Sequence, residues 1–190
     1  WATTQNNLAT AYLDRIRGDR ADNLERAIDA YREALTVNTV EKSPVDWAMT
    51  QNNLANAYLE RIRGNKAENL ERAINLYQEA LKIRTFEAFP QDWAATQHNL
   101  GNAYFYRFRG FREYNLERAI SAYQEALKVR TLKAFPQDWA KTLNNIAAAY
   151  TERIRGDKAE NIEKAIAACQ EALKVYTFDA FPQEWAMTQN

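Results

Sequence analysis

Hydrophobic and polar positions along the chain alternate with the period of an α-helix. A first apolar series lies on one helical face between residues 44 and 63, and its members are Leu54, Ala55, Ala57, Tyr58 and Ile62. A second series predicts another helix that runs to about residue 83, and its members are Leu70, Ala73, Ile74, Tyr77, Ala80 and Leu81. The pattern therefore predicts two helices joined by a turn.

Capping residues mark the ends of both predicted helices. Pro44 suits a first helical turn, where its missing amide proton costs nothing, and Asp46 places a negative charge near the positive end of the helix dipole. Gly64 ends the first helix, which we expect to reach residue 63. Either Asn65 or Asn69 can cap the second helix, and the residues after Asn65 resemble a capping box, which favours the earlier start.

The same pair of helices is predicted along the whole chain. Tryptophan recurs with a step of 46 residues, at Trp1, Trp47, Trp93, Trp139 and Trp185. A period of this length is typical of stacked copies of one unit, each of which buries its apolar face on its neighbours. We therefore expect a single array over residues 1–190, with repeats at 1–46, 47–92, 93–138 and 139–184 and the start of a fifth at 185–190. We also expect this array to be a segment of a longer one.

The two apolar series resemble the two halves of the tetratricopeptide repeat (TPR). Residues 53–58, Asn-Leu-Ala-Asn-Ala-Tyr, are similar to the first half, and residues 73–81, Ala-Ile-Asn-Leu-Tyr-Gln-Glu-Ala-Leu, are similar to the second. The usual period of this family is about 34 residues, and the excess here falls in the turns. The resemblance implies an all-α fold, a right-handed superhelical solenoid of antiparallel helix pairs. It also points to large bacterial multidomain proteins, in which such arrays flank signalling modules that include CHAT-type peptidase domains.

Composition excludes several classes of function. The 25 lysines and arginines balance the 25 aspartates and glutamates, so net charge gives no reason to expect nucleic acid or an anionic membrane as a partner. No apolar run approaches the roughly 20 residues of a membrane span, and no signal-peptide pattern is present. The single cysteine, Cys169, excludes an internal disulfide and fits a reducing compartment, so we expect a cytoplasmic protein.

No group of residues predicts catalysis. His98 and Cys169 are the only histidine and the only cysteine, and together they could suggest a cysteine nucleophile with a histidine base. Cys169, however, takes the place of Tyr31, Tyr77 and Tyr123 in the second helix, which is a core position where a thiol is unreactive. No two histidine or cysteine residues have the spacing of metal ligands, and no glycine-rich phosphate loop occurs. The sequence therefore predicts a protein that is not an enzyme and that holds neither a metal nor a cofactor.

In the TPR family the first helices line a concave groove that takes extended peptides or partner helices. Positions 2, 5, 9, 12 and 16 after each tryptophan form a second, mostly polar stripe, which we expect to face this groove. Carboxamides in the stripe can donate to and accept from a peptide backbone, and arginines can bind a carboxylate through two hydrogen bonds. The predicted groove residues are Asn6, Arg17, Asn52, Asn56, Arg63, His98, Asn102, Phe105, Tyr106, Arg109, Asn144 and Arg155. The sequence thus predicts a groove for an extended, partly acidic peptide.

A structural role is the alternative for both kinds of groove residue. The carboxamides are common in the family whatever it binds. Acids that lie three residues earlier, Glu60 before Arg63 and Glu152 before Arg155, can pair with the arginines within one helical turn.

The third repeat differs from the others, because Tyr106 replaces this acid and leaves Arg109 without a local partner. Further aromatic residues follow at Phe108, Phe111 and Tyr114. Clustered aromatic and arginine side chains are typical of binding hot spots, so this repeat is predicted to be the strongest part of the groove. The alternative is that Phe108 and Phe111 fill the core.

The leading interpretation is a scaffold that binds a protein or peptide partner. One alternative is self-assembly, because the helix that begins at Trp185 lacks a partner helix and the Trp1 end exposes a face that a previous repeat would cover. Another is the regulatory arm of a larger CHAT-type peptidase or signalling protein. A repeat that reads RNA needs side chains that vary between repeats, and the identity of Asn6, Asn52 and Asn144 argues against it.

Overall fold

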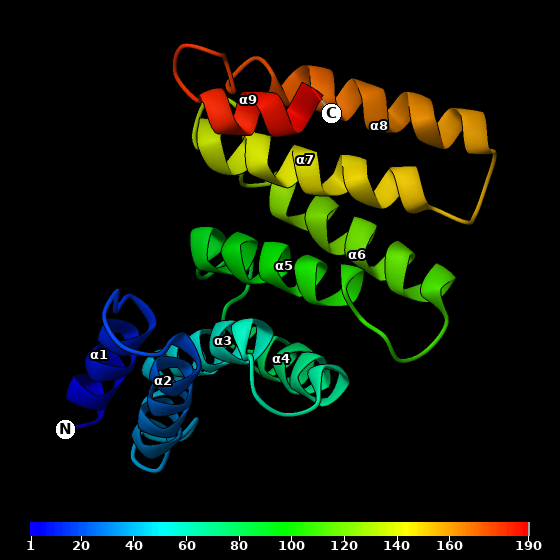
Figure 1. Cartoon of the computed structure of the whole chain (residues 1–190). Coiled ribbons are helices and arrows are strands. Elements are labelled where there is room, and N and C mark those ends of the chain that lie inside the picture. The colour runs from blue at the N-terminus through cyan, green and yellow to red at the C-terminus, as the bar shows by residue number, and fades with distance from the viewer. Residues whose placement is uncertain (190) are drawn as a thin grey trace. The chain divides into compact units, whose positions relative to one another are not determined.

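The computed structural model describes residues 1–189, and within this range the chain forms nine α-helices and no strand (Figure 1). Two compact units, Trp1–Phe89 and Pro90–Asn190, divide the chain. The first unit holds α1 (Ala2–Leu13), α2 (Arg20–Leu35), α3 (Pro44–Glu60) and α4 (Lys66–Ala80). The second holds α5 (Pro90–Phe105), α6 (Arg112–Leu127), α7 (Pro136–Glu152), α8 (Lys158–Ala172) and α9 (Pro182–Gln189). The single array over residues 1–190 stays a prediction.

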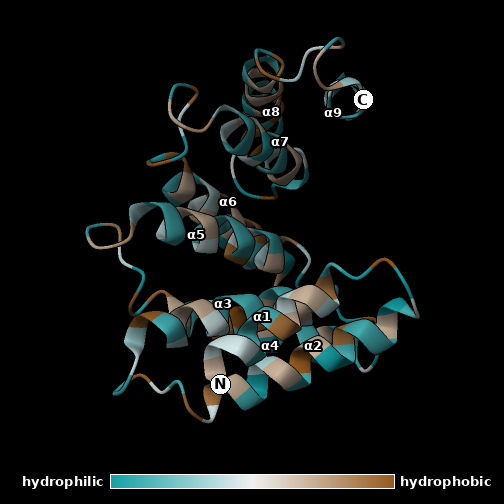
Figure 2. Ribbon diagram, turned by 90° about the vertical axis from the view of Figure 1, so that its left-hand side faces the viewer, coloured by the Kyte–Doolittle hydropathy of each residue, from teal (hydrophilic) through white to brown (hydrophobic). Residues whose placement is uncertain are grey.

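Helix pairs are the building blocks of both units. The helices pack two by two as α1 with α2, α3 with α4, α5 with α6, and α7 with α8. Within each unit the second helix of one pair packs on the first helix of the next, α2 on α3 and α6 on α7. Bands of hydrophobic and hydrophilic residues alternate along the helices (Figure 2), as expected for helices that bury one face and expose the other.

Asparagine and aspartate side chains start most of the second helices. Asn65 Oδ1 accepts a hydrogen bond from the backbone amide of Glu68 at 3.1 Å, so the predicted early start of this helix is confirmed. The first helix of the same pair ends at Glu60, three residues before the predicted end. The reason is that Arg61 adopts an extended backbone (φ −54°, ψ 125°), which interrupts the helical hydrogen bonds before Gly64 turns the chain at a φ of +82°.

Buried alanines and tyrosines form the core between the paired helices. Tyr31, Tyr77 and Tyr123 are among the largest side chains that are fully buried, and each lies on the second helix of its pair. Alanines such as Ala55 and Ala73 are 0% exposed. Because alanine has only a methyl side chain, these positions let two helices approach closely, and the tyrosines fill the space beside them.

The arginines near the turns pair with acids of the neighbouring helix pair, which corrects the prediction of local pairs. Arg63 bonds to Asp22 and Arg155 bonds to Glu113, so neither uses the acid three residues earlier. The acid three residues before Arg155 is Glu152, which already bonds to Arg112. An acid one turn away on the same helix competes poorly once a second helix brings another carboxylate to the same guanidinium.

Candidate functional site

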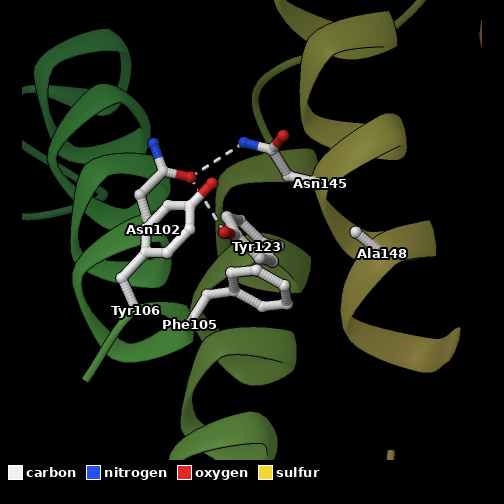
Figure 3. Close-up of a pocket in the computed structure, with 6 residues that line it drawn as sticks. All are labelled: Asn102, Phe105, Tyr106, Tyr123, Asn145 and Ala148. Carbon is white, nitrogen blue, oxygen red and sulfur yellow. Dashed lines mark hydrogen bonds between the residues drawn. The ribbon is translucent and has the colours of Figure 1, made fainter. Parts of the chain in front are cut away.

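A pocket of about 150 Å³ lies between α5, α6 and α7 in the second unit (Figure 3). Its lining consists of Asn102, Phe105, Tyr106, Tyr123, Asn145 and Ala148. Asn102 and Phe105 come from the last turns of α5 and Tyr106 follows directly, whereas Tyr123 comes from α6 and Asn145 and Ala148 from α7. Two successive helix pairs therefore build this pocket together.

Two carboxamides and a phenol form a fixed hydrogen-bond network at the pocket. Asn102 Oδ1 accepts from the hydroxyl of Tyr123 at 2.8 Å and from Asn145 Nδ2 at 2.8 Å. Within the described part of the chain, Asn102 Nδ2 and Asn145 Oδ1 have no protein partner. Figure 3 shows these two atoms on the same side of the Asn102–Asn145 hydrogen bond, facing away from the ring of Phe105. The pocket thus offers one donor and one acceptor side by side.

Aromatic rings supply the apolar wall of the pocket. Phe105 and Tyr106 meet edge to face with ring centroids 5.1 Å apart, and Tyr106 is 59% exposed. The guanidinium carbon of Arg112 lies 4.9 Å from the centroid of the Phe105 ring, and this arginine is held in turn by Glu152. Such ring and cation contacts fix the orientation of Phe105 before any ligand binds.

His98 supports the hydrogen-bond network from the buried side of Asn145. It is 2% exposed, and its ring nitrogens face Thr142 Oγ1 at 3.0 Å and Asn145 Nδ2 at 3.4 Å. Burial lowers the pKa of His98 to about 3, and the nearby positive charges of Arg130 and Lys141 add to the effect. The imidazole is therefore neutral at physiological pH and holds Asn145 in place.

Gly101 lets the ring of Tyr123 approach the backbone of α5. A Cβ atom at this position would lie 2.5 Å from Cε1 of Tyr123, closer than van der Waals contact permits. The sequence has alanine at the equivalent position of the other repeats, Ala9, Ala55 and Ala147. In the third repeat, glycine therefore gives the ring of Tyr123 room that an alanine would fill, although the same tyrosine–asparagine hydrogen bond also forms beside Ala55.

The predicted groove carboxamides and His98 are more buried than side chains that face an open groove should be. Asn6 is 4% exposed and Asn52 is 7% exposed, much like His98, whereas Asn144 is half-buried and donates to Thr188 at 2.7 Å. Asn56 accepts from the hydroxyl of Tyr77 at 2.6 Å, as Asn102 does from Tyr123. Position 5 of each repeat thus lies between helices, and position 9 lies nearer the surface.

All four predicted arginines are exposed, and two of them are paired with acids. Arg63 and Arg155 are held by acids of the preceding helix pair. Arg17 and Arg109 are exposed. The structure therefore brings Asn102, Phe105 and Tyr106 together in one pocket and leaves the arginines outside its lining.

The aromatic residues around the turn between α5 and α6 are exposed. Phe108 is 70% exposed, Phe111 is 85% exposed and Tyr114 is 50% exposed. The alternative in which Phe108 and Phe111 fill the core is therefore wrong. They lie in the turn between α5 and α6, where Phe111 precedes α6 without a side-chain capping bond.

Sequence reasoning missed Tyr123 and Asn145 as pocket residues. Tyr123 was interpreted as core, and it is 1% exposed, yet its hydroxyl reaches the pocket network. A signal for Asn145 was present in the sequence, because the same position holds asparagine in every repeat, at Asn7, Asn53, Asn99 and Asn145. In the fourth repeat this asparagine bonds to Asn102 of the preceding helix pair.

The fourth repeat lacks the phenol–carboxamide pair of the second and third repeats, and in the first repeat the hydroxyl of Tyr31 meets Thr10 instead. Ala148 and Cys169 stand where the third repeat has Asn102 and Tyr123. Both members of the pair have changed together, so neither is left without its partner. Burial raises the pKa of the Cys169 thiol, which keeps it protonated and unreactive.

Comparison with known proteins gives a family and a fold. A family profile described as tetratricopeptide repeat matches residues 1–38, 47–86 and 139–178, which together exceed half of the chain. The chain belongs to the tetratricopeptide-repeat family. A TPR array is an all-α solenoid, and TPR proteins are in general interaction scaffolds without catalytic activity.

A solved structure is similar to this TPR chain. The crystal structure of BtubC (BKLC) from P. vanneervenii superposes with a TM-score of 0.66 at 24% sequence identity. The match covers 92% of this chain and 62% of that one, so the TPR chain spans about 62% of the length of its structural neighbour. At this identity the likeness concerns the fold alone. A search of curated proteins gave no match.

Neither a bilayer-spanning helix nor a metal-binding cluster occurs in the described residues of the TPR chain. None of the helices in residues 1–189 combines the length and the hydropathy that crossing a bilayer requires. The same residues contain no cluster of three or more histidine, cysteine, aspartate or glutamate side chains arranged to hold a metal ion.

Proposed function

We propose that this TPR chain is a protein-interaction scaffold that binds an extended peptide segment of a partner, and that the pocket between α5, α6 and α7 holds the peptide backbone. The observation that carries the proposal is the pair of free amide atoms, Asn102 Nδ2 and Asn145 Oδ1. A peptide group has one N–H donor and one C=O acceptor. It therefore complements this pair without any demand on its side chains.

The size and lining of the pocket support the same proposal. At roughly 30 Å³ for each water molecule, a volume of 150 Å³ holds about five waters, which is enough for a peptide group and part of one side chain. The rings of Phe105 and Tyr106 can cover that side chain, and Tyr106 is exposed enough to be reached. The expected peptide therefore carries an apolar side chain next to the bound peptide group.

The network also favours binding because it is formed in advance. Asn102 is held by hydrogen bonds to Tyr123 and Asn145, and Nδ2 of Asn145 also contacts Nε2 of the buried His98. Side chains that are already ordered lose little conformational entropy when a ligand arrives, whereas each mobile side chain costs about 0.5 to 1.5 kcal/mol to order.

The charge of the partner follows from which exposed arginines are already paired with acids. Arg155 is occupied by Glu113 and Arg112 by Glu152. Arg109, which is exposed in the turn after α5, is the residue of this unit that we expect to attract a carboxylate of the peptide. A mildly acidic peptide is therefore preferred over a strongly acidic one.

Selection from a random peptide library on the immobilised chain tests the proposal. Each recovered peptide is then measured by fluorescence anisotropy against Ala148→Trp, which fills the pocket from an exposed position on α7. Ser121→Trp is the matched control, since it adds the same ring at an exposed position of α6 outside the pocket lining. We expect a loss of about tenfold or more in affinity, or about 1.4 kcal/mol, for Ala148→Trp and no change for Ser121→Trp. Peptides that bind both variants as tightly as the parent chain would place the binding surface elsewhere.

A further inference from the structure

A continuous series of hydrogen bonds leads from the interior of the second unit to the pocket between α5, α6 and α7. Arg130 Nη1 donates to Thr142 Oγ1 at 3.2 Å, and the same oxygen lies 3.0 Å from His98 Nδ1. The other ring nitrogen, Nε2, lies 3.4 Å from Asn145 Nδ2, which donates to Asn102 Oδ1 at 2.8 Å. Buried side chains are therefore connected to both carboxamides of the pocket.

The hydroxyl proton of Thr142 is used within its own helix. Its Oγ1 lies 2.7 Å from the backbone oxygen of Asp138, four residues earlier. The same bond recurs at the equivalent positions of α3, α5 and α9, from Thr50 to Asp46, from Thr96 to Asp92 and from Thr188 to Glu184. A hydroxyl has one proton to donate and two lone pairs that accept. Towards Arg130 and His98, the hydroxyl oxygen of Thr142 is therefore an acceptor.

The neighbouring junction uses its threonine in the same way. Asn144 stands at the position of His98, and its Nδ2 donates to Thr188 Oγ1 at 2.7 Å. Thr188 in turn donates to the backbone oxygen of Glu184 at 2.7 Å. The threonine thus accepts from the preceding helix pair at both junctions.

The acceptor role of Thr142 determines which nitrogen of His98 carries the proton. Burial, together with the nearby positive charges, holds the pKa of His98 at about 3, so the ring is neutral and has one donor and one acceptor nitrogen. Because Thr142 accepts, the proton is on Nδ1, and Nε2 accepts from Asn145. The other amide proton of Asn145 goes to Asn102. With both protons used, Asn145 is held with Oδ1 free for a ligand.

The opposite arrangement leaves a buried donor without an acceptor. With the proton on Nε2 of His98, Asn145 would have to turn its Oδ1 towards the ring. Asn102 would then have to turn its Nδ2 towards Asn145. The phenol proton of Tyr123, whose side chain is 1% exposed, would lose the oxygen that now accepts it. Thr142 at one end of the series and Tyr123 at the other therefore favour the same arrangement.

We propose that Thr142 is a positioning residue of the peptide site, which through the tautomer of His98 fixes the direction in which a peptide crosses the pocket. This inference rests on the proposed function and deepens it. In an extended peptide the N–H and C=O of one residue point to the same side, and the chain runs from the N–H to the C=O. The N–H meets Asn145 Oδ1 on α7, and the C=O meets Asn102 Nδ2 on α5. The peptide therefore has its amino end over α7 and its carboxyl end over α5.

The tautomer can be read directly, because His98 is the only histidine in the sequence. Long-range proton–nitrogen NMR at about pH 7.5 distinguishes a protonated ring nitrogen from an unprotonated one, and we expect the proton on Nδ1. Thr142→Val replaces the hydroxyl by a methyl group and should populate the form with the proton on Nε2. Thr142→Ser keeps the hydroxyl and should keep the parent form. Tyr123→Phe removes the other end of the series and should also keep it, since Thr142 is still present.

The direction of the peptide is measured with a tight-binding peptide from the random library, synthesised with a nitroxide at one end. A nitroxide at the amino end should broaden NMR signals of α7, and one at the carboxyl end should broaden those of α5. Thr142→Val should weaken the affinity of this peptide by about threefold, because only molecules with the required tautomer bind it. Thr142→Ser should bind it as the parent does.

Three results would overturn the inference. The first is a parent imidazole with its proton on Nε2. The second is a Thr142→Val variant, folded by circular dichroism, that matches Thr142→Ser in both tautomer and affinity. The third is a bound peptide whose amino end lies over α5. Failure of the proposed function looks different: library peptides would bind Ala148→Trp as tightly as the parent, while the peptide-free spectra still place the proton of His98 on Nδ1.

Discussion

Replacing His98 by asparagine should remove a large part of the pH dependence of the stability of the second unit. Asparagine is the residue at this position in the other repeats, at Asn6, Asn52 and Asn144, so the substitution fits the architecture. In the folded chain the pKa of His98 falls from 6.5 to about 3. Below pH 6.5 the unfolded chain therefore binds a proton at this residue that the folded chain does not, and the free energy of unfolding decreases as the pH falls from about 6.5 towards 3.

The size of the effect follows from the two pKa values. One pKa unit corresponds to about 1.4 kcal/mol, and pH 5 lies about 1.5 units below the unfolded pKa, so the parent chain should lose about 2 kcal/mol between pH 7.5 and pH 5 through His98. Above pH 7 the contribution should be constant. Carboxylates such as Glu117, whose pKa is lowered by its hydrogen bonds to Arg153, titrate equally in both proteins and cancel in the comparison.

Urea denaturation of the parent and of His98→Asn at the two pH values measures this difference. We expect the parent to lose about 2 kcal/mol more than the variant. Equal losses would refute the reasoning, and so would an NMR titration that places the pKa of His98 near 6.5 in the folded chain. Either result would mean that the imidazole reaches solvent and does not support Asn145.

Two further variants, one single and one double, test the packing around the pocket. Gly101→Ala places a Cβ atom 2.5 Å from the ring of Tyr123, so we expect urea denaturation to show a loss of about 1 to 3 kcal/mol, although alanine alone would favour the helix by about 1 kcal/mol. A gain in stability would show that the ring moves freely. Ala148→Asn combined with Cys169→Tyr should recreate the phenol–carboxamide hydrogen bond in the fourth repeat and stabilise the chain by about 1 kcal/mol beyond the sum of the single variants. If thermal denaturation shows that the stability change of the double variant equals the sum of the two single changes, the hydrogen bond does not form.

The helix pairs were predictable because periodicity and caps act locally. The apolar series gave both helices of each pair, and Asn65 gave the start of the second helix together with its capping bond. The end of the first helix was harder to predict from the sequence. It depends on Arg61, which leaves the helical conformation and bonds to Glu25 of the preceding pair, a contact between residues 36 positions apart.

The depth of the groove residues was not predictable from a single helix. A helical stripe gives the direction of a side chain, but the next helix pair decides whether that direction faces solvent. His98 points at Thr142, 44 residues later, and is buried by it, whereas Tyr106 meets no such neighbour and is exposed. The alternative of local acid partners for Arg63 and Arg155 was wrong for the same reason, because the acid that binds Arg155 is Glu113 on another helix pair.

The side-chain amide signals of Asn102 and Asn145 in proton–nitrogen NMR spectra test the account most directly. When a peptide recovered from the library is added to the labelled chain, both signals should shift, and both should stay unchanged when the same peptide is added to Ala148→Trp. A peptide that binds the parent chain while both signals keep their positions would contradict the claim that this pocket holds the peptide backbone.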